Sequence, residues 1–306
     1  MGYADIWGHI VMGHNLTGWD WEKVGVTAVL SLTLAGCATF NLDDTIDDYF
    51  GTAEPEEAID EAFVAYELGD YAEAHRLWEP YADQGNASAQ YNLGAMFDNG
   101  QGVPQDYTKA IRWYRMSAGQ GDADAQYHLG SMYRNGKGVP QNYTEAIRWW
   151  DKSAEQGNAN AQADLGFVYD NGLGVPKDYS KAMDLYLMAA EQGDAIAQNN
   201  LGVMYINGNG VPEDYAKALH WYLRAAEQGV EPAQYYLGVM FVTGQGVPNY
   251  IEAYRWWDIA AAAGNADAVM KRDKVAAVMT PEQITDAQKL AREWRPKQDG
   301  MSPNRF

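Results

Sequence analysis

The sequence predicts an all-α solenoid built from helix-turn-helix repeats with a period of 36 residues. Three short motifs recur at this fixed step. Gly-Val-Pro begins at Gly102, Gly138, Gly174, Gly210 and Gly246; Leu-Gly begins at Leu93, Leu129, Leu165, Leu201 and Leu237; Ala-Gln begins at Ala89, Ala125, Ala161, Ala197 and Ala233. A fixed period of this length is typical of a solenoid, because one unit cannot bury its apolar face alone and must stack on copies of itself.

Each repeat is expected to contain two helices, A and B, with start and stop signals. An Asn or Asp that can cap the first turn precedes helix A at Asn86, Asp122, Asn158, Asp194 and Asn265. The same residue types precede helix B at Asp70, Asp106, Asn142, Asp178, Asp214 and Asn249. Glycine is expected to end helix A at Gly100, Gly136, Gly172 and Gly208, and helix B at Gly85, Gly121, Gly157, Gly193 and Gly229. The Gly-x-Gly-Val-Pro loop then prevents helix A from continuing.

The apolar positions of each unit recur at helical spacing. Helix A keeps an Ala, a Leu, a Met and an aromatic residue, as at Ala89, Leu93, Met96 and Phe97. Helix B keeps the slots of Tyr107, Ala110, Trp113 (Trp149 in the next copy) and Ala118. Glycine inside a helix costs about 1 kcal/mol relative to alanine. Its recurrence therefore predicts a structural role, with Ala110 and its equivalents packing closely on Gly94, Gly130, Gly166, Gly202 and Gly238.

These residues resemble a known family. The repeat pattern is clearest at residues 197–229. It reads Ala-Gln-x-x-Leu-Gly-x-Met-Tyr, then Asn-Gly-x-Gly-Val-Pro-x-Asp-Tyr, then Lys-Ala-x-x-Trp-Tyr-x-x-Ala-Ala-Glu-Gln-Gly. This pattern resembles the Sel-one-like repeat, a relative of the tetratricopeptide repeat. The resemblance covers about residues 58–295. It implies a right-handed α-solenoid that acts as an adaptor or binding scaffold and carries no catalytic residues. Some members have a disulfide in each repeat, which this chain lacks.

Composition limits the partners. The 306 residues include 42 acidic and 22 basic side chains, for a net charge of −20. Nucleic acid is therefore not an expected partner, because its phosphates would be repelled. Basic peptides are compatible with this charge, although an acidic surface can also serve solubility alone.

The amino-terminal region predicts a lipid anchor. Residues 24–35 form an apolar run of 12 residues, which is too short to span a bilayer but suits a signal-peptide core. The run ends at Leu-Ala-Gly-Cys37, which resembles the lipobox of bacterial lipoproteins, and Cys37 is the only cysteine. We therefore expect residues 1–36 to be a signal peptide and Cys37 to be acylated. The residue after Cys37, Ala38, resembles a signal for the outer membrane, so the expected location is the bacterial envelope, facing the periplasm. The true start can be Met1 or Met12, and a start at Met12 would shorten the long segment before the apolar core. The alternative to a signal peptide is a misread start followed by an unrelated apolar helix.

The remaining segments complete the predicted domain organisation. Residues 37–57 are acidic and are expected to form a solvated tether. A degenerate tetratricopeptide-like unit spans 58–85, and the five repeats span 86–264. Two capping helices are expected within 265–295, the second starting at a capping box formed by Thr280 and Gln283, and a frayed tail over 296–306.

The sequence offers little catalytic chemistry. His75, His128 and His220 lie in three different units, and no two of them share a helix turn with a Cys, Asp or Glu at ligand spacing, so no metal site is predicted. No nucleophile motif is present, and no cofactor is expected. The favoured function is a scaffold that binds a protein or peptide, and we do not expect an enzyme. The alternative is carbohydrate or peptidoglycan binding, or hydrolase activity (β-lactamase-like, for example), on the same solenoid.

The predicted binding surface is a stripe along helix A, formed by the positions that vary most between repeats. Helix A usually lines the concave face of such a solenoid, so the stripe is expected to form a groove for a peptide. Variable positions can also be merely tolerant ones, and that alternative stays open. Tyr235 and Tyr236 are the expected anchors, because exposed aromatic residues often dominate binding energy. The candidate residues are Tyr91, Asn92, Asp98, Tyr127, His128, Arg134, Asp164, Phe167, Asp170, Asn199, Asn200, Tyr235 and Tyr236, flanked by Ala95, Ser131, Val203, Ile206, Val239 and Val242.

Overall fold

The computed structural model describes residues 55–244 and 248–297, which contain fourteen α-helices and no β-strand. They lie within one compact unit, Glu54–Phe306. The A helices are α2 (Pro55–Glu67), α4 (Ala87–Asn99), α6 (Ala123–Asn135), α8 (Ala159–Asn171), α10 (Ala195–Asn207) and α12 (Glu231–Thr243). The B helices are α3 (Tyr71–Asp83), α5 (Tyr107–Gly119), α7 (Tyr143–Glu155), α9 (Tyr179–Glu191), α11 (Tyr215–Glu227) and α13 (Tyr250–Ala262), and the chain ends with α14 (Ala266–Ala276) and α15 (Pro281–Glu293). The predicted all-α solenoid with a 36-residue period is confirmed.

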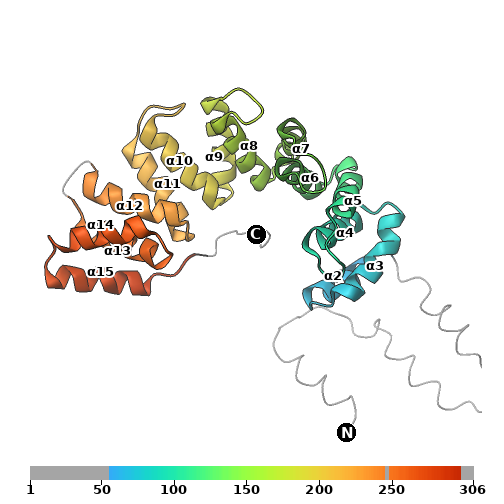
Figure 1. The fold of residues 1–306 in the computed structure, drawn as a ribbon, viewed down its shortest axis with the longest axis horizontal. Coiled ribbons are helices and arrows are strands. Elements are labelled where there is room, and N and C mark those ends of the chain that lie inside the picture. Colours follow the sequence, from blue (N-terminus) through green and yellow to red (C-terminus); the bar gives the residue numbers. More distant parts are fainter. Residues whose placement is uncertain (1–54, 245–247, 298–306) are drawn as a thin grey trace, which may run out of the picture. The chain divides into compact units, whose positions relative to one another are not determined.

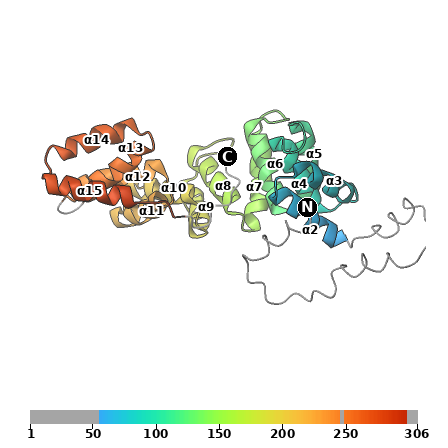
Figure 2. The same cartoon turned by 90° about the horizontal axis from the view of Figure 1, so that it is seen from below.

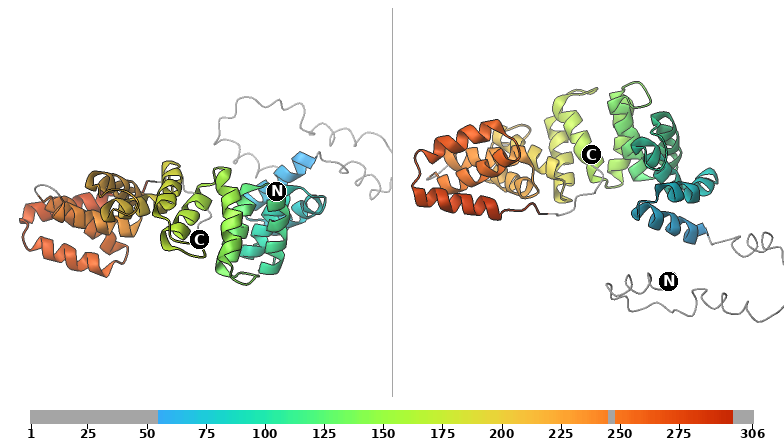
Figure 3. Two further views of the ribbon diagram at one scale, coloured as in Figure 1. Left: turned by 90° about the horizontal axis from the view of Figure 1, so that it is seen from above. Right: turned by 60° about the horizontal axis from the view of Figure 1, so that its bottom comes forward.

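Each helix packs mainly on its neighbours in the sequence. Figure 1 shows the helix pairs following one another from α2 to α15, and the turned views in Figures 2 and 3 show the same succession. Because each repeat contacts mainly its adjacent repeats, the stability of the array depends on the contacts within and between successive units.

The predicted caps are confirmed. Asn158 accepts a hydrogen bond from the Ala161 amide at 3.0 Å. The equivalent residues Asn86, Asp122, Asp194 and Asn265 cap α4, α6, α10 and α14 in the same way. At α12, Val230 provides no side-chain cap. Asp106 accepts from the Thr108 and Lys109 amides, as the caps of the other B helices do from theirs. Gly100, Gly136, Gly172 and Gly208 end their A helices in the left-handed conformation.

The glycine inside each A helix faces an aromatic ring of helix B, which corrects the sequence prediction. A Cβ built on Gly166 would lie 2.7 Å from Cδ1 of Tyr186, and the same ring position meets Gly94, Gly130, Gly202 and Gly238. The partner rings are those of Tyr114, Trp150, Tyr186, Tyr222 and Trp257. The alanine predicted to pack there is buried in every repeat, but the atoms nearest to the glycine belong to the ring. At Gly130 the Ala146 carbonyl oxygen is also among the nearest atoms, at 3.0 Å. The ring residue lies four positions, about one turn, after the alanine on helix B, and its longer side chain reaches the glycine.

The Gly-x-Gly-Val-Pro loop contacts the preceding repeat. Its second glycine has φ close to +70°, as at Gly138, where the value is +70°. A Cβ at Gly138 would lie 2.6 Å from the carbonyl oxygen of Tyr107, the first residue of the previous helix B. Gly102, Gly174 and Gly210 make the equivalent approach to Tyr71, Tyr143 and Tyr179. The loop therefore joins units as well as ending helix A, which explains why this glycine recurs.

A buried glutamine in each of the helices α4, α6, α8 and α10 bonds to both flanking B helices. Gln162 is 1% exposed, and its Nε2 donates to the Ala154 carbonyl oxygen at 3.2 Å. Its Oε1 accepts from Nε2 of Gln192, the residue that ends α9, at 2.8 Å. Gln90, Gln126 and Gln198 make the same two contacts. We call this series the glutamine ladder.

The two ends of the array differ from its middle. Helix α2 begins at Pro55, inside the segment 37–57 that was expected to be a tether. At the other end, Thr280 and Gln283 form the predicted capping box of α15, and Ala287 is fully buried against the last repeat. Lys297 lies in the segment expected to be frayed, yet its amide and its ammonium group both donate to Glu227, each at 2.7 Å.

We predict that Gly166→Val destabilises the array by several kcal/mol, because a branched side chain would push the Tyr186 ring off α8. The matched control is Asp184→Val on the exposed surface of α9, which also introduces a β-branched residue but meets no buried ring. Urea unfolding followed by circular dichroism measures both. Similar midpoints for the two variants would contradict the role assigned to the glycine.

Candidate functional site

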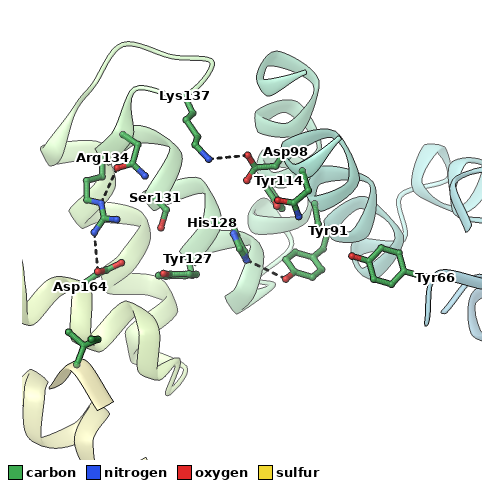
Figure 4. Close-up of a pocket in the computed structure, with 14 residues that line it drawn as sticks. Tyr66, Tyr91, Asp98, Tyr114, Tyr127, His128, Ser131, Arg134, Lys137 and Asp164 are labelled. Atoms are coloured by element: carbon green, nitrogen blue, oxygen red, sulfur yellow. Dashed lines mark hydrogen bonds and ion pairs between the residues drawn. The ribbon is translucent and has the colours of Figure 1, made fainter. Parts of the chain in front are cut away.

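Side chains of successive A helices line a groove. Its volume is about 550 Å³, and it runs over α2, α4, α6, α8 and the start of α10. Six of the predicted binding residues line it, together with Ala95 and Ser131: Tyr91, Asp98, Tyr127, His128, Arg134 and Asp164 (Figure 4). We call it the central groove. The structure thus brings together positions that lie about one repeat apart in the sequence.

His128 lies in an aromatic cluster at the base of the groove. Its ring stacks on Tyr114 at 5.2 Å with an interplanar angle of 9°, and the Tyr127 ring meets it edge-on at 5.3 Å. The Tyr91 hydroxyl lies 3.4 Å from His128 Nε2. Burial lowers the pKa of His128 from 6.5, and this effect exceeds the opposing influence of Asp98 and Asp124. His128 is therefore neutral at pH 7, and it fixes the positions of the rings around it.

Two ion pairs cross the groove between repeats. Arg134 Nη1 on α6 lies 3.0 Å from Asp164 Oδ1 on α8. Lys137, in the loop after α6, lies 3.5 Å from Asp98 on α4. Both pairs are partly exposed, with the arginine and lysine side chains 31% and 43% accessible. The groove therefore offers a partner paired charges of both signs next to aromatic surface.

A smaller hollow continues the groove toward α10. Its volume is about 160 Å³, and it is lined by Phe167 and Asn200 together with Arg134 and Asp164. Phe167 is 43% exposed, which leaves a large apolar surface in contact with solvent. Two of the remaining candidates, Phe167 and Asn200, thus adjoin the central groove.

Five predicted residues do not line these hollows: Asn92, Asp170, Asn199, Tyr235 and Tyr236. Burial raises the pKa of the Asp170 carboxyl, an effect that Lys177 partly offsets. The Tyr236 ring stacks on Tyr222 at 5.6 Å and meets Tyr235 edge-on at 5.4 Å. Burial also raises the pKa of Tyr235. The two tyrosines thus already pack against protein rings, and they remain a predicted contact surface outside the central groove.

Six groove residues were missed from the sequence: Tyr66, Asn99, Tyr114, Asn135, Lys137 and Ile196. Tyr66 belongs to the degenerate first unit, where its hydroxyl donates to Gln101 Oε1 at 2.9 Å. Tyr114 lies on a B helix and reaches the groove past Gly94. Lys137 occupies the variable position of the Gly-x-Gly loop. A comparison of the loop sequences alone could have identified this position as a candidate.

No group of three or more His, Cys, Asp or Glu side chains able to hold a metal ion occurs within residues 55–244 and 248–297. In the same part of the chain, none of the helices is both long enough and apolar enough to cross a bilayer. Cys37 and the predicted signal peptide lie outside the described residues.

The stacked helix pairs and the groove along their A helices define a helical-repeat scaffold. The family model for the Sel1 repeat matches five consecutive segments: 87–122, 123–158, 159–194, 195–230 and 231–265. The protein belongs to the Sel1 repeat family, whose repeats generally mediate protein–protein interaction.

Several solved structures are similar to this chain. A Sel1 repeat protein from Oxalobacter formigenes is 34% identical, with 77% of this chain and 96% of that chain covered and a TM-score of 0.66. A protective antigen with the same repeat type, c5321, from uropathogenic Escherichia coli is 28% identical over 79% of this chain and 68% of its own, with a TM-score of 0.44. A putative Sel1 repeat protein from Klebsiella pneumoniae is 26% identical over 66% and 99%, with a TM-score of 0.43. No curated protein matches the sequence.

Proposed function

We propose that this protein is an adaptor that binds an extended segment of a partner protein in the central groove. The observation that carries the proposal is the convergence of variable residues from successive repeats on one continuous hollow. The repeat positions that hold the fold together are nearly constant, whereas His128 and Arg134 differ from their counterparts in all the other repeats. The position of Tyr127 holds Tyr in three repeats and Ala or Asn in the other two. A surface that varies on a constant frame is what a binding scaffold needs.

The chemistry of the groove suits a peptide. Tyrosine and arginine are enriched at protein interfaces because they combine apolar area with hydrogen-bonding groups. Tyr127 presents a ring edge, and Arg134 and Lys137 are partly accessible beside their acidic partners. An extended backbone can donate to Asp98 and Asp164 while its side chains contact the rings. The proposal is a binding role without catalysis.

We further propose that the scaffold is tethered to the bacterial envelope through a lipid on Cys37. The support is the apolar run that ends at the single cysteine of the chain. Two or more acyl chains would hold the protein firmly on a membrane, whereas one chain binds only marginally. The groove would then work next to the membrane surface, in the periplasm.

We predict that the double variant Tyr127→Ala/Arg134→Ala captures its partner from envelope extract at least tenfold less well, equivalent to about 1.4 kcal/mol. The control is Arg148→Ala/Tyr215→Ala, which removes the same residue types from the exposed surface of B helices. Capture is measured by quantitative mass spectrometry on matched amounts of folded protein. If the groove variant captures its partner as well as the wild type does, the binding site lies outside the central groove. If the wild-type protein is retained on purified peptidoglycan and captures no protein, the carbohydrate-binding alternative is favoured.

We predict that Cys37→Ala abolishes incorporation of labelled palmitate and releases the protein from the membrane fraction. Expression of the wild type and the variant in a bacterial host, followed by fractionation, checks this directly. A variant that still sediments with membranes would show that the lipid is not the anchor.

A further inference from the structure

A second pocket lies where the predicted binding stripe reaches the end of the array. Val239 and Val242 of α12 occupy the repeat positions that hold Ser131 and Arg134 in the central groove, three repeats earlier. Together with Trp257 of α13 and Val275 of α14, they line a pocket of about 260 Å³. The predicted binding stripe thus carries paired charges in the central groove and an apolar surface at the end of the array. We call this hollow the C-terminal pocket.

The walls of this pocket are mainly apolar. Trp257 is 3% exposed, and its Nε1 donates to the Tyr235 carbonyl oxygen at 3.1 Å, so that donor is already used. The Thr243 hydroxyl is used in the same way, because it donates to the Val239 carbonyl oxygen at 2.8 Å. A volume of about 260 Å³ is below the usual range for small-molecule sites, which begins at about 300 Å³. It suits one or two amino-acid side chains.

Two lysines of α14 border the pocket. Lys271 and Lys274 are exposed and make no hydrogen bond, ion pair or ring contact with any residue that the structure describes. By contrast, Lys137 in the central groove is paired with Asp98. Like charges three residues apart on a helix repel each other, so an anion placed between them is favoured. This unpaired positive charge stands out in a chain of net charge −20.

We propose that the C-terminal pocket binds a large apolar side chain of the partner segment, with an acidic side chain next to it pairing with Lys271 and Lys274. This inference rests on the proposed function and adds a sequence preference to it. The apolar walls would bury the side chain, and the charge of the two lysines is complementary to the acid. The partner segment would therefore be acidic and apolar at this end of the stripe.

The test uses the full-length protein and a hexapeptide, Gly-Asp-Leu-Phe-Glu-Gly, that carries an uncharged fluorophore and is blocked at both ends so that only side chains carry charge. Fluorescence anisotropy should show binding that weakens as salt is raised. Lys271→Glu/Lys274→Glu should reduce affinity at least tenfold. Lys289→Glu, which reverses an exposed lysine of α15 outside the pocket, should leave it unchanged. Replacing Leu and Phe of the peptide by Ala should also remove binding.

Failure of the peptide to bind, or equal binding by the pocket variant, would overturn the proposal. So would tighter binding of the matched peptide with Lys in place of Asp and Glu. These outcomes differ from failure of the proposed function, because partner capture through the central groove is scored with Tyr127→Ala/Arg134→Ala. If that variant loses partner capture but the peptide does not bind, the proposed adaptor function stands. Only the proposed preference for an acidic and apolar segment at the C-terminal pocket is then wrong.

Discussion

The contact on which the array depends is the buried glutamine that joins three helices. A buried amide must satisfy its hydrogen bonds, because leaving one group unpaired costs about 1–3 kcal/mol. Gln126 meets this demand with the Ala118 carbonyl in the preceding B helix and with Gln156 at the end of its own repeat. Apolar side chains could slide past one another with little cost, whereas these directional bonds fix how one repeat sits on the next. The glutamine ladder thus sets the register of the solenoid.

The groove is a consequence of that register. Arg134 and Asp164 are separated by 30 residues, yet they form an ion pair because adjacent A helices are held at a fixed offset. The ladder also shows where the array stops. The last loop is one residue shorter, Ala263 follows α13 where a glutamine follows the other B helices of the repeats, and Gln234 Oε1 is buried without a hydrogen-bond partner. Beyond this point Arg272 and Asp273 replace the Leu-Gly pair, Arg272 bonds to Asp258, and α15 covers the open end.

Periodicity predicted the elements well and the contacts less well. The caps at Asn158 and Asp106 were readable because capping depends on local sequence alone. The side chain that packs on the helix A glycine could not be predicted in this way. The period shows that the glycine recurs, but not whether the alanine or the aromatic ring of helix B contacts it. Part of the groove was predictable, because variable positions of helix A do converge. Lys137 lies on a loop and Tyr114 on a B helix, so no pattern along helix A could reveal them.

The most direct test of the ladder compares the unfolding of two variants, Gln162→Leu and Gln234→Leu. The first removes two hydrogen bonds, one to the Ala154 carbonyl and one from the Gln192 amide. The second removes only the bond to the Ala226 carbonyl, together with an oxygen that had no partner. Urea titration should show that Gln162→Leu loses more free energy of unfolding, by about 1 kcal/mol. Equal losses, or no loss for Gln162→Leu, would contradict the claim that the glutamine ladder holds the repeats in register.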